Sequence, residues 1–346
     1  MKVAGLKRVS CIVIAATALS GLPPAILGAT QLPVAVQDDS ADSHPGFDLS
    51  RLELNSARRV EVEAALAKKD YKQAERILVE EVEQDPKSFR AANLLEFAGG
   101  IFFMDGEYLN SVIAWKRAEA ITPLGERTRF TLAMAYIKLN RRNWARPELE
   151  KLTAAQPGNS LYPYWLARLD YDGQRYLDAI GRLQKVVELD PKMMRAYDLL
   201  GLCYDYLGRL DEAIKNFSRA VELNRSQSTP SAWPRLDMAI SQIELNQLAE
   251  AEKNLREAIG YDSHLPQARY QLGRVLEKQA KYQEAVQALI EAAALDPGYP
   301  EPHYLLGRIY QRLGQGPLAT AEIQRFQQLQ KSRPAPPATK PTSPPN

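Results

Sequence analysis

Residues 196–223 read AYDLLGLCYDYLGRLDEAIKNFSRAVEL, and this stretch contains the pattern that decides the fold. Apolar residues recur at helical spacing in its first half, as at Leu199 and Cys203. Gly208 can then end a helix, because glycine tolerates the left-handed backbone of a helix stop. A second apolar stripe through Phe217 follows. The stretch therefore predicts two short amphipathic helices joined by a tight turn. Neither is long enough to be stable alone in water, so each must gain its stability by stacking on neighbours.

The same pattern repeats along the chain at intervals of 34 residues, with one interval of 38. A small residue stands at Gly99, Ala133, Ala167, Gly201, Ala239, Gly273 and Gly307. A second small residue follows twelve positions later, at Ser111, Ala145, Ala179, Ala213, Ala251, Ala285 and Ala319, and Ala74 extends this series by one unit. A large apolar residue lies four positions further on, at Leu78, Trp115, Leu149, Leu183, Phe217, Leu255, Leu289 and Ile323. The four additional residues fall in the polar segment 225–229, and the offsets survive across that insertion. The chain is therefore built from internal repeats.

This pattern resembles the tetratricopeptide repeat family. The fifth unit matches its signature at Tyr197, Leu200, Gly201, Tyr204, Gly208, Ala213, Phe217 and Ala220. The seventh and eighth units match at Leu272, Gly273, Ala285, Pro297, Leu306, Gly307, Tyr310 and Ala319. The first unit, residues 50–86, departs because Val62 occupies the small position and three additional residues precede the second unit. The resemblance implies an all-α solenoid of about eight helix-turn-helix repeats. It also implies a right-handed superhelix whose first helices line a concave groove used for binding peptides or proteins.

The two ends of the chain have a different composition. Lys2, Lys7 and Arg8 precede an uncharged run over residues 9–22, a length that suits a signal peptide better than a membrane span. We therefore expect a signal peptide at 1–29, with retention as an uncleaved anchor as the alternative. Residues 30–49 are expected to form a disordered linker and 50–331 the solenoid. The proline-rich residues 332–346 are expected to form a disordered tail. Export to the periplasm or cell envelope follows from the predicted signal.

The composition argues against several functional classes. The chain has 44 basic and 42 acidic residues, and removal of the three basic residues of the signal leaves 41 against 42. That balance argues against nucleic-acid binding. Two cysteines and three scattered histidines provide neither a disulfide framework nor a histidine-rich metal site. We find no phosphate-binding loop, dinucleotide fingerprint, HExxH pair or nucleophile elbow. The sequence predicts no enzyme, no catalytic residue, no cofactor, no metal and no membrane span in the mature chain, and it leaves the oligomeric state open.

Candidate binding residues follow from the family geometry, in which positions three before, one after and four after the first small residue share an inward stripe. The stripe and its flanks contain Phe130, Tyr164, Trp165, Arg168, Tyr171, Tyr206, Trp233, Tyr270, Arg274, Lys278, Tyr304, Arg308 and Arg312. Tyr and Arg often dominate binding energy, and the recurring Tyr/Arg pairs suit an extended segment with acidic groups. The fifth unit is instead acidic at Asp198 and Asp205. The alternative is that these side chains only stack between adjacent repeats.

The sequence therefore predicts a non-enzymatic scaffold for protein–protein interaction. Its groove would bind an extended segment of a partner during envelope complex assembly or secretion. Two other functions stay open. One is a glycan- or peptidoglycan-binding solenoid that uses the groove aromatics as stacking platforms. The other is a regulatory subunit of an enzyme complex.

Overall fold

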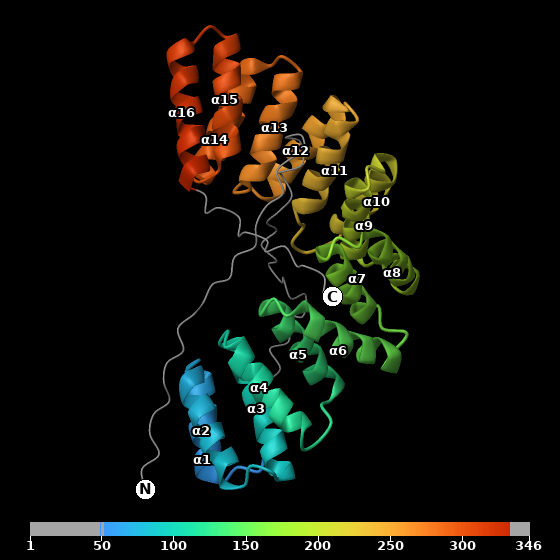
Figure 1. The fold of residues 1–346 in the computed structure, drawn as a ribbon, viewed down its shortest axis with the longest axis vertical. Helices are drawn as coiled ribbons and strands as arrows, with labels where there is room; N and C mark the ends of the chain where they lie inside the picture. Colours follow the sequence, from blue (N-terminus) through green and yellow to red (C-terminus); the bar gives the residue numbers. More distant parts are fainter. Residues whose placement is uncertain (1–48, 50–51, 333–346) are drawn as a thin grey trace, which may run out of the picture. The chain divides into compact units, whose positions relative to one another are not determined.

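The computed structural model describes residue 49 and residues 52–332, and within these residues it contains sixteen α-helices and no strand (Figure 1). The helices are α1 (Ser56–Ala67), α2 (Tyr71–Gln84), α3 (Phe89–Met104), α4 (Tyr108–Glu119), α5 (Glu126–Lys138), α6 (Arg142–Ala155), α7 (Leu161–Asp172), α8 (Tyr176–Leu189), α9 (Met194–Tyr206), α10 (Leu210–Asn224), α11 (Trp233–Glu244), α12 (Leu248–Tyr261), α13 (Pro266–Lys278), α14 (Tyr282–Leu295), α15 (Pro300–Arg312) and α16 (Gly316–Ser332). The predicted signal peptide, nearly all of the linker and the tail after Ser332 lie outside the described residues.

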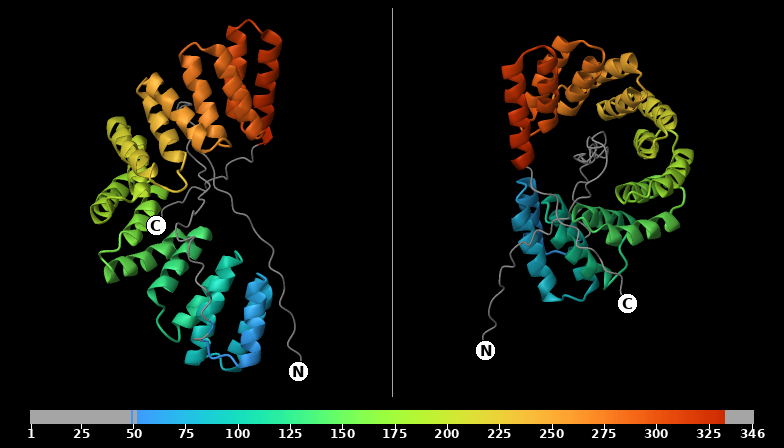
Figure 2. Two further views of the ribbon diagram at one scale, coloured as in Figure 1. Left: turned by 180° about the vertical axis from the view of Figure 1, so that it is seen from behind. Right: turned by 45° about the horizontal axis from the view of Figure 1, so that its top comes forward.

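Within each compact unit, each helix packs on the one that follows it in the chain. The helices belong to two compact units, of which one contains α1–α13 and the other α14–α16. In the first unit every helix from α1 to α12 contacts its successor, and in the second α15 contacts both α14 and α16. Figure 2 shows this succession of helix pairs from two further directions. The predicted all-α solenoid of about eight helix pairs is confirmed.

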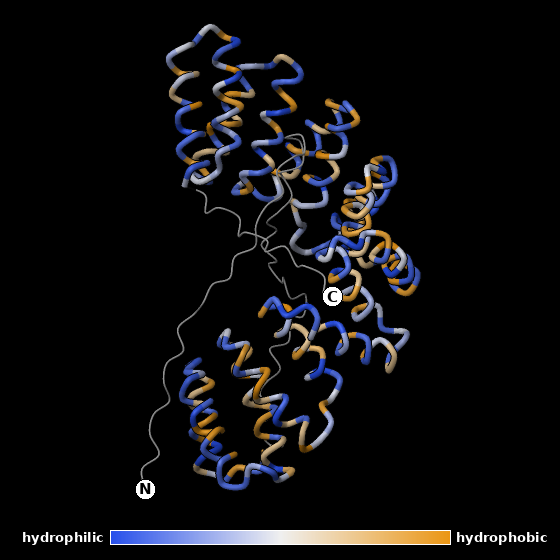
Figure 3. Tube along the Cα trace, in the orientation of Figure 1, coloured by the Kyte–Doolittle hydropathy of each residue, from blue (hydrophilic) through white to orange (hydrophobic). Residues whose placement is uncertain are grey.

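Apolar and hydrophilic residues alternate along the helices, as expected for amphipathic elements that bury one side (Figure 3). The second small position of each unit is buried, and its relative exposure is 0% from Ala74 in α2 to Ala285 in α14. The large apolar residues four positions later are buried core side chains from Leu78 to Leu289, and Trp115 and Phe217 are the largest of them, whereas Ile323 is half-buried. The positions identified from the repeat therefore form the core. None of the described helices is long and apolar enough to cross a bilayer.

In five pairs the size of the first small residue matches the size of the large residue sixteen positions later, whereas Gly273 and Gly307 are followed by Leu289 and Ile323. A Cβ atom at Gly99 would lie 2.3 Å from the Trp115 ring, and one at Gly201 would lie 2.5 Å from the Phe217 ring. Units with alanine at the first position instead have leucine at the second, as in Ala133 with Leu149. Both members of that pair are fully buried. The two helices of a pair therefore approach until the ring or leucine fills the space that the small residue leaves.

The turn between the two helices of a pair has one recurring backbone conformation. The residue seven positions after the first small position has a positive φ in all eight pairs. These residues are Lys69, Gly106, Asn140, Gln174, Gly208, Asn246, Ala280 and Gly314. Only three are glycine, although glycine adopts this conformation at the lowest cost. The prediction that Gly208 ends a helix is confirmed, and the five turns without glycine at this position keep the same geometry.

The two ends of the helical array also follow the repeat. α1 and α2 pack as a pair, and Val62 at the small position is fully buried although it is larger than its equivalents. Residues 50–86 therefore have the geometry of a repeat over their described part. In α16 the buried residue is Ala319, whereas Gln324, Gln327 and Gln328 are exposed, as expected for a solvated end helix.

A matched pair of glycine substitutions tests the close helix approach. Gly201→Ala introduces a Cβ that Phe217 must move to accommodate, and we expect it to lower the free energy of unfolding by about 1–3 kcal/mol. Gly181→Ala lies inside α8 with open space around its Cβ, and we expect a gain of about 0.5–1 kcal/mol. Thermal melts followed by circular dichroism measure both effects. Equal shifts of the two variants would contradict the packing argument.

Candidate functional site

The first helices of neighbouring pairs lie against one another. α3 contacts α5, α9 contacts both α7 and α11, and α11 contacts α13. We call the surface of these six helices the first-helix face. Its stripe positions are mostly half-buried, as at Phe130 and Ile240. Half-buried side chains provide both packing area and a surface that a ligand can reach.

The predicted aromatic residues of this face contact one another. The ring of Phe130 lies 5.5 Å from that of Tyr162, and Tyr164 lies 5.9 Å from Trp165. Tyr164 is buried, with 8% of its surface exposed, whereas Phe130 and Trp165 are half-buried. Stacking between side chains is therefore part of their role. Trp233 and Tyr270 are also half-buried on this face, in α11 and α13.

Three tyrosines join the fourth and fifth pairs. Tyr206 stacks on Tyr176 at 4.9 Å with an interplanar angle of 12°, and Tyr171 meets both rings edge-on at 5.7 Å. The hydroxyl groups of Tyr171 and Tyr206 also share a hydrogen bond. Burial raises the pKa of Tyr171, and the nearby charges of Tyr206 and Asp237 add to the shift. The structure therefore brings the predicted residues Tyr171 and Tyr206 together.

The basic residues predicted on this face have partners within the chain. Arg168 Nε donates to Asp172 at 3.2 Å and its guanidinium lies 5.7 Å from the Tyr171 ring centre. Arg274 donates to Gln271 at 2.7 Å and lies 3.6 Å from Glu244. The exposed Lys278 reaches a backbone carbonyl of α11 at 3.4 Å. These pairings leave each cation with less unbalanced positive charge and fewer free hydrogen-bond donors for an acidic ligand.

The remaining predicted residues belong to the second compact unit. Tyr304 is 46% exposed and contacts Phe326 at 5.3 Å, while Arg308 lies 5.9 Å from the Tyr304 ring centre. Arg312 donates to the hydroxyl of Tyr282 at 3.3 Å. These three predicted residues are thus on the surface of α15 and contact α14 and α16.

Three acidic residues of the fifth and sixth pairs, on the first-helix face, have raised pKa values. Burial raises the pKa of Asp198 to about 7, opposed by the charge of Arg168. Burial also raises the pKa of Asp205, although Ser241 donates a hydrogen bond to it at 2.5 Å. The pKa of Asp237 is raised well above its ordinary value, by burial first and then by the charges of Asp198 and Asp205. The sequence indicated Asp198 and Asp205 but not Asp237, which lies one position away from the stripe.

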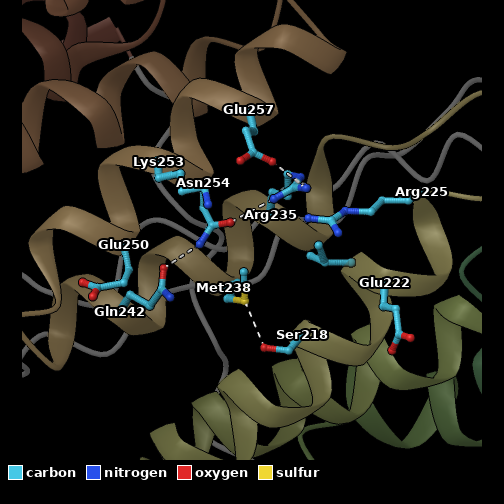
Figure 4. Close-up of a pocket in the computed structure, with 11 residues that line it drawn as sticks. Ser218, Glu222, Arg225, Arg235, Met238, Gln242, Glu250, Lys253, Asn254 and Glu257 are labelled. Atoms are coloured by element: carbon cyan, nitrogen blue, oxygen red, sulfur yellow. Dashed lines mark hydrogen bonds and ion pairs between the residues drawn. The ribbon is translucent and has the colours of Figure 1, made fainter.

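A cavity of about 320 Å³ lies between α10, α11 and α12, in a part of the molecule that the sequence did not single out (Figure 4). In its wall the buried Arg235 donates to Asn254 at 3.0 Å, and Asn254 donates to Gln242 at 2.9 Å. Arg235 also pairs with Glu257 at 2.6 Å. The cavity is lined by three basic and three acidic residues: Arg225, Arg235, Lys253, Glu222, Glu250 and Glu257. Because its charge is balanced and its buried polar groups join α11 to α12, we interpret it as a structural junction.

The other reactive residue types have structural surroundings. Cys203 is fully buried, and burial raises the pKa of its thiol to about 12, so it is an inert core residue. His303 lies 2.6 Å from Glu322 and joins α15 to α16, whereas His264 is exposed after α12. Over residues 52–332, no group of three or more histidine, cysteine, aspartate or glutamate side chains is placed to hold a metal ion.

Comparisons with known proteins identify the repeat. A model of the tetratricopeptide repeat matches residues 196–227, and a related TPR repeat model matches residues 278–314. The anaphase-promoting complex subunit 3 of Dictyostelium discoideum is 37% identical over 73 residues. That match covers 21% of this chain and 8% of the relative, so the chain corresponds to a small part of that protein.

Solved structures share the fold at low sequence identity. A tetratricopeptide repeat protein from Parabacteroides merdae has a TM-score of 0.57 and 15% identity, with 78% of this chain and 98% of that chain covered. PilW, a type IV pilus biogenesis factor, has a TM-score of 0.54 and 18% identity, with 60% and 94% covered. PilF of Pseudomonas aeruginosa has a TM-score of 0.52 and 19% identity, with 61% and 94% covered.

The tetratricopeptide repeats that the family models match support a role for this chain as a scaffold for protein–protein interaction. The repeat offsets, the paired helices and the matching family models agree on one assignment: this chain contains tetratricopeptide repeats.

Proposed function

We propose that the first-helix face binds an extended segment of a partner protein and that the chain acts through this binding, without catalysis. The observation that carries the proposal is the contact between neighbouring first helices, which between α5 and α7 is made by the rings of Phe130 and Tyr162. These contacts align half-buried aromatic and charged side chains from successive repeats. An extended peptide can contact several such repeats at once, because its side chains recur at regular spacing. Half-buried aromatic residues can supply much of the binding energy.

The chain is, in this proposal, an exported protein of the periplasm or cell envelope. The basic start and uncharged run of residues 1–22 support export. PilW, a type IV pilus biogenesis factor, shares the fold, which is compatible with a role in envelope complex assembly or secretion. We assign the scaffold to residues 50–331. We expect cleavage of the signal peptide to separate residues 1–29 from this scaffold.

Binding to the first-helix face can be tested with two tryptophans in different surroundings. Trp165 belongs to the first helix α7, whereas Trp144 belongs to the second helix α6 and is 53% exposed. Peptides selected from a displayed random dodecapeptide library on the wild-type protein would serve as probes in fluorescence anisotropy. We expect Trp165→Ala to weaken binding by roughly fivefold or more, because aromatic truncation at a binding surface typically costs over 1 kcal/mol. Trp144→Ala should leave binding within about twofold.

Circular dichroism melts of both variants provide the control for folding. A loss of binding in the Trp144 variant alone, or a library that yields no enriched peptide on the wild-type protein, would contradict the proposal.

Export can be tested with a fusion of residues 1–45 to a phosphatase that is active only after leaving the bacterial cytoplasm. We expect phosphatase activity and a shortened N-terminus in mass spectrometry, because the charged start and apolar run have the form of a cleavable signal. Replacing Ile12, Val13 and Ile14 by aspartate should abolish the activity. An inactive fusion that accumulates in the cytoplasm would refute export.

A further inference from the structure

The cavity at the junction of α10, α11 and α12 has room for a small molecule (Figure 4). Its volume of about 320 Å³ falls within the range of small-ligand sites, which is roughly 300–1,000 Å³. Val221 and Met238 give part of the wall an apolar surface, and the other lining residues are polar or charged. The contacts of Arg235, Asn254 and Gln242 join the helices around this space. Sites for small molecules commonly combine such an apolar wall with a few fixed polar groups.

The cavity lies beside the four-residue insertion in the repeat pattern. The connection between α10 and α11, residues 225–232, is the longest connection between consecutive helices within residues 52–332. The buried Asn224 fixes this connection, because it donates to the carbonyl of Ser231 at 2.7 Å and accepts from its amide at 2.8 Å. Arg225, the first residue of the connection, lines the cavity. The departure from the regular repeat thus contributes directly to the cavity wall.

The cavity wall contains a guanidinium group whose donors are only partly used. Only 3% of the surface of Arg235 is exposed. Its Nη1 donates to Asn254 at 3.0 Å, and its Nη2 pairs with Glu257 at 2.6 Å. The Tyr261 ring centre lies 5.5 Å away, but Nε is shielded from solvent and has no hydrogen-bond partner among the described residues. Because a guanidinium has five N–H donors, Arg235 can still donate to an acceptor in the cavity, and an anionic oxygen is the strongest acceptor.

The charged lining residues are equal in number for the two signs, but they are not all paired with one another. Glu257 pairs with Arg235, and Glu222 pairs at 2.6 Å with Arg219, which is not among the lining residues. The lining residues that form no ion pair in the described part of the chain are Arg225, Lys253 and Glu250. All three are exposed, so their charged ends can approach a molecule in the cavity. Two positive charges and one negative charge therefore remain for a ligand.

We propose that this cavity binds an acidic α-amino acid, that is, free aspartate or glutamate. At neutral pH such a molecule has two carboxylates and one ammonium group, which complement the two unpaired cations and the unpaired carboxylate. Its carboxylates accept from Arg225 and Lys253, and one of them also accepts from Arg235. Its ammonium group donates to Glu250. The inference is independent of the proposed peptide binding on the first-helix face.

Two simpler classes of ligand fit the lining less well. An inorganic anion leaves Glu250 without a partner and is repelled by the acidic residues of the wall. A neutral amino acid has a single carboxylate, so it leaves one of the two unpaired cations without an anionic partner. Both classes serve as comparisons in the experiment.

Isothermal titration calorimetry of the purified chain with L-glutamate and L-aspartate tests the proposal. The comparison ligands are L-glutamine, which lacks the second carboxylate, N-acetyl-L-glutamate, which lacks the ammonium group, and inorganic phosphate. We expect at least one of the two acidic amino acids to bind roughly fivefold or more tightly than each comparison ligand, because each of these leaves a charged group of the cavity unpaired.

Two variants locate the binding in the cavity. Lys253→Gln removes one exposed cation of the lining, and we expect it to weaken binding of the acidic amino acid by roughly threefold or more. The matched control is Lys215→Gln, which removes an exposed lysine from the same repeat position of α10, and it should leave the affinity unchanged. Ser218→Trp introduces an indole into the cavity without a change of charge, and we expect it to weaken binding by roughly tenfold or more. Circular dichroism melts of the three variants control for folding.

The outcomes are distinguishable from those of the peptide experiment. Absence of binding of both acidic amino acids at concentrations up to about 10 mM would overturn the inference. Equal affinity for glutamate, aspartate and glutamine, or unchanged affinity in folded Lys253→Gln and Ser218→Trp variants, would overturn it as well. None of these results affects the binding of peptides to the first-helix face, so the proposed function would stand.

Discussion

The close approach of the two helices in each pair is the constraint on which the rest of the structure depends. Gly99 and Gly201 leave room for the rings of Trp115 and Phe217, and alanine leaves room for leucine in other pairs. A helix of twelve to seventeen residues has little stability alone, so this contact and the next pair together determine whether it forms. The distance between the helices also sets which stripe of each first helix faces its neighbours. The surface that we propose for binding is therefore a consequence of the core.

The fold could be predicted from the sequence because its determinants are local and periodic. The 34-residue interval placed the helix pairs, and the buried positions followed from the offsets of Ala133 and Ala145. The turns were harder to predict from the sequence. Gln174 and Ala280 adopt a positive φ, although neither is a glycine or asparagine, the residues that usually indicate this conformation. Position in the repeat, and not local propensity, fixes the backbone there.

The candidate site could be predicted only in part, because the charge that a side chain can offer to a ligand depends on its ion-pair partners, and these are not visible in the repeat pattern. The sequence identified Tyr171 and Arg168 as exposed binding residues, but it could not show that Arg168 pairs with Asp172. Asp237 falls outside the stripe, and its raised pKa depends on burial first and then on the charges of Asp198 and Asp205 on another helix. The Arg235–Asn254–Gln242 chain is equally invisible, since its members come from two helices with no shared motif. The repeat period predicts which residues are buried. The hydrogen-bond and ion-pair partners of polar side chains depend on how the helices pack, and the sequence does not give these.

The match between a small and a large residue has a consequence for how such a chain can change in length. Gly201 and Phe217 lie in the same helix pair, as do Ala133 and Leu149, so each pair contains both halves of its own tightest contact. A whole 34-residue segment can therefore be duplicated, deleted or exchanged without separating these partners. Substitution of one member alone requires a compensating change sixteen residues away. Evolution by copying units is thus less disruptive to this interior than evolution by single replacements.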